Sequence, residues 1–338
     1  MAAMKPVADQ KSVEKTNRTW LHFVAGGIGG MAGAVVTAPF DVVKTRLQSD
    51  MYIDRHRAAT TYRGLARPFV QAGSHVVDTC RIIAEVYTIE GPKALFKGLG
   101  PNLVGVIPAR AINFYCYSNG KAVFEKRFGI SSDSSYNHLL SAATAGVATS
   151  TATNPIWLIK TRLQLDKEHA ESAHAKRQYK NSLDCTLQVM RNEGIKGLYR
   201  GLTASYLGVV ESTLQWILYE RMKTFVSQKE QSRQARGLEI TTTDKFLGWA
   251  AKSGAAGLAK VVASILTYPH EVLRTRLRQK PLIQGQPKYT GLIQCFKLVW
   301  LEEGFVGLYG GLTPHLMRTV PNSIIMFGTW DLIMKTFG

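Results

Sequence analysis

The chain has 338 residues, with 42 lysines and arginines against 24 aspartates and glutamates, so its formal net charge is +18 at pH 7. Charged residues make up only 20% of the chain and apolar residues 45%, which is too apolar for a disordered basic tail, and 30 glycines are too many for a coiled coil. The mean hydropathy of −0.06 argues against a densely apolar membrane bundle, but not against a bundle whose helices face an aqueous cavity.

Neither the start of the chain nor its cysteines carries a familiar functional signal. Residues 1–18 mix acidic and basic side chains without an apolar core. They predict an N-terminal extension rather than a secretory signal or a cleavable mitochondrial presequence. The four cysteines are too widely spaced for a metal or redox motif, and we expect no disulfide framework at this length.

Two stretches are long enough and uncharged enough to cross a membrane. Residues 19–40 and 134–159 contain no charged side chain over 22 and 26 residues, and a crossing needs ~20 apolar residues. Charges interrupt the other apolar stretches, namely Arg110, Glu211, Lys252, Lys260 and Arg318. Because a charge in mid-span is costly against lipid, we expect these side chains to face an aqueous interior. The alternative, a soluble helical array with buried paired charges, does not explain the uncharged stretches.

A proline-led motif occurs three times at nearly equal intervals. Its copies are PFDVVKTRLQ at 39–48, PIWLIKTRLQ at 155–164 and PHEVLRTRLR at 269–278. Each copy is followed by a second motif, EGPKALFKG at 90–98, EGIKGLYRG at 193–201 and EGFVGLYGG at 303–311. Two linked motifs in three copies predict a tandem triplication of a unit of roughly 100 residues. Each unit is predicted to hold two long helices flanking a short amphipathic one.

Small residues four positions apart predict close helix packing near the start of the chain. Gly26 and Gly30, and then Gly29 and Gly33, form two overlapping pairs of this kind. The same segment nearly matches a dinucleotide-binding fingerprint, but no strand precedes it and no acidic residue follows at the required distance. Helix packing is therefore the better interpretation.

The two linked motifs resemble the signature of the mitochondrial carrier family, Pro-x-acid-x-x-base followed by acid-Gly-x4-aromatic-base-Gly. The resemblance extends over residues 20–337. It implies an all-α membrane protein with six transmembrane helices in three tandem two-helix repeats, short matrix helices, and a pseudo-threefold bundle around a central cavity. It also implies a multi-pass transporter of the inner mitochondrial membrane that is not an enzyme, uses no cofactor, works as a monomer and opens one site alternately to either side.

The expected repeats lie at 19–128, 134–227 and 244–338. The first repeat is longer because it contains a basic insertion, 50–77. We expect this insertion to be a solvated matrix loop, and a regulatory or lipid-surface role is the alternative.

The proline motif is expected to form a gate on the matrix side. Proline removes a backbone hydrogen bond and bends its helix, so three bent helices can converge at one end. In the family, the acid of one repeat pairs with the base of the next. The resemblance therefore implies ion pairs of Asp41 with Lys160 and of Glu271 with Lys44.

Two positions depart from the family pattern at this gate. Trp157 stands at the acidic position of the second repeat, which leaves Arg274 without its usual partner. Gln48 and Gln164 match the glutamines that brace the family's ion pairs, whereas Arg278 replaces the third.

The gate at the opposite, cytoplasmic end is expected to be weaker. The family pattern there is aromatic-acid-x-x-base, and the second repeat matches it with Glu220 and Lys223. The first repeat retains only Lys121 and the third only Asp331. One complete pair, Asp331 with Lys121, is implied, so an outward-open state should be easy to reach.

The second motif resembles the family's cardiolipin sites, where helix N-termini offer free amides to phosphate. Lys97 with Gly98 and Arg200 with Gly201 match it, and Gly291 matches the companion half-motif. The alternative is ordinary helix capping by glycine.

The resemblance also indicates where substrate binds, seven residues after the glycine that opens each even-numbered helix. These positions are Gly105, Gly208 and Arg318. Gly208 and Val209 match a Gly-aliphatic pair found in carriers of nucleotides and nucleotide-containing cofactors. Arg318 offers a forked, permanently charged donor set suited to phosphate.

The interior charges favour an anionic substrate. Arg110, Lys252, Lys260 and Arg318 are four cations, against one acid, Glu211. Lys252 is equally well explained as a structural partner of a helix terminus. For Arg318, the substrate phosphates are the available anion.

Trp157 places the chain with family members that carry pyrimidine nucleotides, NAD, flavin or folate, and several stretches most resemble the pyrimidine nucleotide carriers. Glu211, Gln215 and Trp216 are candidates for reading and stacking a base. The expected function is exchange of pyrimidine nucleotides of the UTP, TTP and CTP type. An NAD, flavin or folate carrier is the alternative, and a proton-leak member a more distant one. Nucleic-acid binding would explain the charge but leaves the threefold motif unexplained.

Overall fold

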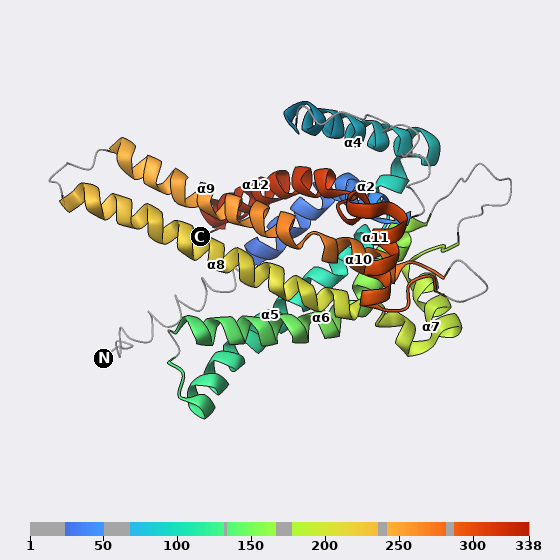
Figure 1. Cartoon of the computed structure of the whole chain (residues 1–338), viewed down its shortest axis with the longest axis horizontal. Helices are drawn as coiled ribbons and strands as arrows, with labels where there is room; N and C mark the ends of the chain where they lie inside the picture. The colour runs from blue at the N-terminus through green and yellow to red at the C-terminus, as the bar shows by residue number, and fades with distance from the viewer. Residues whose placement is uncertain are drawn as a thin grey trace, which may run out of the picture.

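The computed structural model describes residues 24–50, 68–131, 134–166, 178–235, 242–281 and 287–337. Every regular element within these ranges is helical, so the fold class is all-α. Figure 1 shows long helices running along the molecule, with α7, α10 and α11 gathered towards one end and α4 on the outside. The expected N-terminal extension, 1–18, lies outside the described residues.

The first repeat begins with a bent helix pair. Val24–Val36 is followed by α2 (Ala38–Gln48) at an angle of 61°. The break falls at Thr37, whose hydroxyl donates to the Gly33 carbonyl at 2.7 Å, and Pro39 lies in the first turn of α2. Proline has no N–H to continue the helical ladder, so the bend is located where the sequence predicts it. The rest of the repeat comprises α4 (Pro68–Glu90), the 3₁₀ helix η2 (Pro92–Phe96) and α5 (Leu99–Phe128).

The other repeats follow the same order. The second contains α6 (Ser135–Leu165), α7 (Ser182–Leu198) and α8 (Leu202–Ala235). The third contains α9 (Thr242–Thr267), α10 (Pro269–Arg278), α11 (Leu292–Leu308) and α12 (Leu312–Phe337). Pro269 follows a helix break at Tyr268, as Pro39 follows one at Thr37, whereas Pro155 lies inside the continuous helix α6.

The basic insertion is not entirely a loop. Helix α4 starts at Pro68, so 68–77 is helical, contrary to the expectation of a loop over 50–77. The helix is held in place through its C-terminal half, where Ile82 and Val86 join a small core with Val43 of α2. Residues 51–67 lie outside the described part of the chain.

A small apolar core joins the proline-led helix of each repeat to its short helix. The buried members are Val43, Ile82, Val86, Ala94 and Leu95 in the first repeat; Leu158, Ile159, Leu163, Tyr179, Cys185 and Val189 in the second; and Leu273, Leu277, Tyr289, Cys295, Val299 and Leu308 in the third, joined by Ala204 of α8 in the second repeat. These three cores hold the proline-led helices at one end of the bundle.

Glycine at the first helix allows the two ends of the chain to meet. A Cβ added at Gly29 would lie 2.6 Å from the Met326 carbonyl oxygen, and one at Gly33 would lie 2.6 Å from Asn322 Oδ1, both on α12. A Cβ does not fit against the Met326 carbonyl, so the close packing predicted for Gly29 and Gly33 is confirmed, whereas a Cβ at Gly26 would meet no atom within 4 Å. The first and last long helices are therefore in contact.

None of the helices in the described ranges is, on its own, both long enough and apolar enough to qualify as a membrane span. The bent pair of Val24–Val36 and Ala38–Gln48 qualifies when its two halves are taken together.

Candidate functional site

Two buried ion pairs link different repeats where α2, α6 and α10 meet. Lys160 Nζ lies 3.1 Å from Asp41 Oδ2, and Lys44 Nζ lies 2.6 Å from Glu271 Oε2. These are the two pairs that the proline motif implies. Both carboxylates are at most 10% exposed, so each needs a close cation to remain charged in this position.

Each of these carboxylates binds a second cation through its other oxygen. Arg318 of α12 forms an ion pair with Asp41 Oδ1, and Arg274 forms one with Glu271 Oε1. Arg274 lacks its usual partner from the second repeat, since position 157 is a tryptophan, and it binds instead the acid three residues earlier in its own helix. The available anion for Arg318 is likewise Asp41, rather than a substrate phosphate alone.

Trp157 occupies the place of the missing third acid. Its indole N–H donates to Thr153 Oγ1 at 2.9 Å, and Lys160 Nζ lies 5.4 Å from the centroid of its ring. Among the described side chains of this network, two acids, Asp41 and Glu271, therefore pair with four cations.

Beside these ion pairs, arginines form a ring of hydrogen bonds between the repeats, called here the arginine ring. The sequence did not predict it. The arginine two residues after each motif base donates its Nε–H to a backbone carbonyl of another repeat. The bonds are Arg46 to Gln164 at 3.2 Å, Arg162 to Arg278 at 3.2 Å and Arg276 to Gln48 at 3.0 Å. The three bonds run from the first repeat to the second, to the third and back to the first.

The same arginines also bind the glutamates that open the second motif. The pairs are Arg46 with Glu90, Arg162 with Glu193 and Arg276 with Glu303. The available signal was the occurrence of both residues in all three copies, but their different sequence separations concealed the pairing.

The bracing positions form hydrogen bonds rather than ion pairs. Gln164 accepts from Thr45 at 2.8 Å and Gln48 accepts from Thr275 at 2.6 Å. Arg278 cannot accept, and the matching hydroxyl of Thr161 donates instead to the Trp157 carbonyl at 2.9 Å. Arg278 itself donates to two buried oxygens, Asn154 Oδ1 at 2.8 Å and Ser205 Oγ at 2.9 Å.

Lys260 and Arg318 already have carboxylate partners, so the described interior carries less uncompensated positive charge than the sequence suggests. Lys260 Nζ lies 2.7 Å from Glu211 Oε1, which also accepts from Ser264 at 2.8 Å. Lys252 has a side chain outside the described part of the structure. Arg110 is exposed and contacts the Met326 sulfur at 3.8 Å, with no carboxylate partner among the described side chains. Arg110 is thus the uncompensated cation of the predicted set within the described part of the chain.

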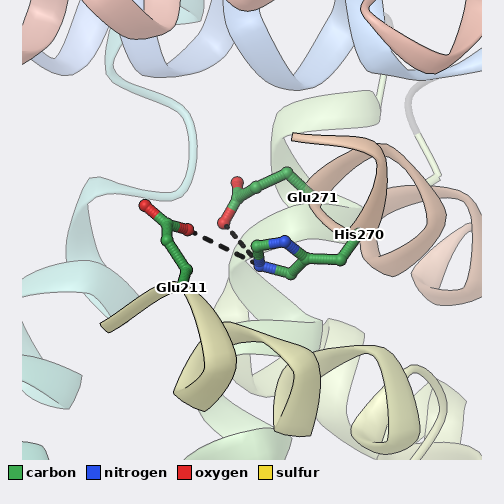
Figure 2. Close-up of side chains that lie close together, drawn as sticks. All are labelled: Glu211, His270 and Glu271. Atoms are coloured by element: carbon green, nitrogen blue, oxygen red, sulfur yellow. Dashed lines mark ion pairs between the residues drawn. The ribbon is translucent and has the colours of Figure 1, made fainter. Parts of the chain in front are cut away.

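Glu211, His270 and Glu271 approach one another from α8 and α10 (Figure 2). His270 Nε2 lies 3.7 Å from Glu211 and 3.8 Å from Glu271, while Nδ1 contacts the Thr267 carbonyl at 2.5 Å. Both carboxylates already carry Lys or Arg partners, so this is a charge-compensated cluster rather than a free metal-ligand set.

The two glycines at expected substrate positions lie against residues of the neighbouring repeat. A Cβ at Gly105 would lie 3.0 Å from Ile156 and 3.5 Å from Trp157, and one at Gly208 would lie 3.5 Å from His270. Val209 does not belong with them, because its methyl groups lie against Gly146 and serve the contact between α8 and α6. Gln215 is half-buried and Trp216 is 37% exposed.

The opposite end of the bundle carries the residues of the expected cytoplasmic gate. Glu220 and Lys223 form a pair at 3.5 Å, but both belong to α8 and are exposed, so this pair does not cross between helices. The Asp331 side chain lies outside the described residues, and the pair with Lys121 stays a prediction.

Two of the expected lipid positions also hold structural ion pairs. Lys97 binds Glu90 at 3.2 Å and donates to the Asp166 carbonyl at 2.7 Å, and Arg200 binds Glu193 at 3.1 Å. A cavity of about 260 Å³ lies between the N-termini of α5 and α7, lined by Lys93, Lys97, Gly98, Gly100, Lys180 and Ser182 among others. Gly291 is the N-cap of α11.

Comparison with known proteins agrees with the threefold organisation. Residues 15–128, 131–230 and 245–338 match the family described as mitochondrial carrier protein. The chain is 57% identical over 330 residues to the mitochondrial pyrimidine nucleotide transporter RIM2 of Saccharomyces cerevisiae, covering 95% of this chain and 86% of that protein. It is 54% identical over 331 residues to the mitochondrial carrier protein rim2 of Schizosaccharomyces pombe, covering 98% and 94%. It is 39% identical over 328 residues to human solute carrier family 25 member 33, covering 95% and 96%.

Three matched repeats, each built around a proline-led helix whose acid or base reaches into another repeat, place the whole described bundle in one family. The chain belongs to the mitochondrial carrier family.

Proposed function

We propose that the chain exchanges pyrimidine nucleotides of the UTP, TTP and CTP type across the inner mitochondrial membrane by alternating access to a single central site. The observation that carries the substrate class is the 57% identity, over 95% of this chain, to a protein named as a mitochondrial pyrimidine nucleotide transporter. The shared Asp41 carboxylate, which ties α2, α6 and α12 together at one end of the bundle, supports the gating mechanism.

The proposed architecture has six membrane-spanning segments in a pseudo-threefold arrangement. These segments are Val24–Val36 with α2, α5, α6, α8, α9 with α10, and α12. The closed cycle of arginine-to-carbonyl bonds supports this symmetry, because each repeat is bonded to the next in the same way. The short helices α7 and α11 would then lie on the matrix side, together with α4.

In this arrangement the charged network of Asp41, Lys44, Lys160, Glu271 and Arg274 is the closed matrix gate. Glu220 and Lys223 pair within one helix, which supports a cytoplasmic end that stands open in this conformation. A nucleotide would enter from the cytoplasm and meet Arg110, Arg318 and Lys260 on its way to the gate. The side chains of Arg318 and Lys260 are 28% and 33% exposed, so both remain within reach of a ligand.

The same proposal assigns a lipid role to the second motif. Cardiolipin phosphate would bind at the N-terminus of α5 beside Lys97 and Gly98, where the cavity opens, and at the equivalent Arg200 and Gly201. Gly291 would provide backbone amides at the start of α11. The carrier would work as a monomer.

Exchange in proteoliposomes tests the substrate class. Purified protein is reconstituted with internal UTP, and uptake of labelled UTP is measured while external TTP, CTP, NAD, FAD or folate competes. The proposal expects competition by the pyrimidine nucleotides. Preferential competition by NAD, FAD or folate would assign the chain to those carriers instead, and a fatty-acid-dependent proton leak without nucleotide exchange would exclude exchange as its function.

A further inference from the structure

Trp157 is a partly exposed aromatic side chain at a position where the gate otherwise uses charge. Its one polar atom, the indole nitrogen, is bonded within its own helix to Thr153 Oγ1 at 2.9 Å. The ring is thereby fixed in orientation, and its remaining surface is apolar.

The position of the ring relative to α5 is equally specific. A Cβ at Gly105 would lie 3.5 Å from Cη2 and Cζ2 of the indole, so the six-membered half of the ring lies where a side chain from 105 would project. Position 105 is the first-repeat member of the set expected to contact substrate. The helix α5 therefore offers no side chain there, and the neighbouring repeat supplies an aromatic surface instead.

Three successive contacts connect this aromatic ring to Arg318, the expected phosphate-binding residue. Lys160 Nζ lies 5.4 Å from the ring centroid and 3.1 Å from Asp41 Oδ2. Asp41 Oδ1 in turn binds Arg318. The indole and the guanidinium are thus linked through Lys160 and Asp41. A nucleotide has the same two parts, a flat base and a polyanion joined by a sugar.

We infer that the Trp157 indole is the surface on which the nucleotide base stacks while Arg318 binds the phosphates, an assignment that rests on the proposed nucleotide exchange. Base-on-aromatic stacking tolerates different bases, because each has a π-face, and it contributes substantially to affinity. Stacking on the indole competes with Lys160 for the ring, and phosphate competes with Asp41 for Arg318. Release of Arg318 from Asp41 removes the ion pair that joins α12 to α2 at this end, which couples nucleotide binding to its opening.

The test separates the base from the phosphates by comparing UTP with inorganic tripolyphosphate. Both ligands are titrated against purified full-length protein, and affinity is obtained from thermal stabilisation and from competition with labelled UTP uptake. We expect Trp157→Leu to weaken UTP by about five- to a hundredfold and to leave tripolyphosphate unchanged. Trp157→Phe should retain most of the UTP affinity, and Arg318→Ala should weaken both ligands.

A spectroscopic readout accompanies the titration. UTP should quench part of the indole fluorescence of the parent protein, and this part should be lost in Trp157→Phe although that variant still binds UTP. The measurement keeps the inference testable even where Trp157→Leu folds poorly.

Equal weakening of UTP and tripolyphosphate by Trp157→Leu, or unchanged quenching in Trp157→Phe, would overturn the assignment and leave Trp157 as a structural element of the gate. These outcomes differ from a failure of the proposed function. In that case the parent protein itself would bind UTP no more tightly than tripolyphosphate.

Discussion

Arg318 forms an ion pair with Asp41 across 277 residues of sequence, joining the last helix of the bundle to the first repeat. The contact closes the circle of repeats at the level of the gate. It also gives the proposed phosphate-binding residue a carboxylate partner. An incoming phosphate must therefore compete with a carboxylate, and the carboxylate that it releases belongs to the gate.

Exchanging the charges of Asp41 and Lys160 together is expected to recover more transport than either single reversal. Each single reversal places two like charges about 3–4 Å apart in a buried position, which is strongly unfavourable. Recovery will be incomplete, because Arg318 also binds Asp41 and would face a new lysine. UTP exchange of the three variants at matched protein density is the measurement, and equal loss in all of them would show that the two residues do not act as a pair.

Removing a glutamate that pairs with one arginine of the ring is expected to lower the free energy of unfolding. In Glu303→Gln the fully buried Arg276 loses its carboxylate partner, since the two side chains are 0% and 6% exposed. Removing one partner of a buried pair costs about 3–5 kcal/mol. Glu220→Gln is the matched control, because Glu220 is 39% exposed and its pair within the helix contributes about 0–1 kcal/mol. The thermal unfolding midpoints of the two variants are compared in detergent. Equal midpoints would mean that the pair of Arg276 with Glu303 does not stabilise the fold.

The short helices are expected to protect two of the four thiols. Burial raises the pKa of the Cys185 and Cys295 thiols to about 12. Near neutral pH their thiolate fraction is therefore on the order of a thousandfold below that of an ordinary thiol. Cys80 on α4 is exposed and serves as the internal control. Maleimide labelling followed by peptide mass spectrometry should modify Cys80 first and reach Cys185 and Cys295 only after unfolding. Early labelling of Cys185 in folded protein would contradict the packing of α7.

Trp157→Asp is expected to strengthen the closed end, because it restores the third acid. The gain will be smaller than the sequence alone predicts, since Arg274 already binds Glu271 Oε1. The expected result is a higher unfolding midpoint with slower UTP exchange. If both quantities stay at the parent values, position 157 does not belong to the gate.

The sequence predicts the ion pairs in which both motif positions carry a charge. It does not predict the partner of a residue whose expected acid is replaced. Asp41 with Lys160 and Lys44 with Glu271 follow from the family resemblance, in which the acid of one repeat pairs with the base of the next. Arg274 could not be assigned in this way, because its partner in the register is Trp157. Only the structure shows that Glu271, one helical turn earlier, has a carboxylate oxygen available for Arg274.

The expected substrate positions show a similar limit of the sequence. A glycine at 105 or 208 indicates available space, but not which neighbour fills it, and the structure places Trp157 and His270 beside them. Val209 shares its sequence signal with Gly208 but points towards Gly146, because adjacent residues on a helix face different directions. The arginine ring could not be predicted from residue types, because its acceptors are backbone carbonyls, which every residue has.

The central claim, that Arg318 binds the substrate phosphates at a gate it shares with Asp41, is tested most directly by nucleotide exchange of Arg318 variants. Arg318→Ala, Arg318→Lys, the parent and the exposed-site control Arg191→Ala on α7 are reconstituted at equal density, and labelled UTP uptake against internal nucleotide is measured. Loss of a desolvated, charge-assisted contact costs ~2–5 kcal/mol, so Arg318→Ala should lower exchange by roughly thirtyfold or more. Arg318→Lys should recover part of it, because an ammonium lacks the fork, and Arg191→Ala should match the parent. Exchange of UTP by Arg318→Ala at the parental rate would contradict the account and leave Arg318 as a purely structural partner of Asp41.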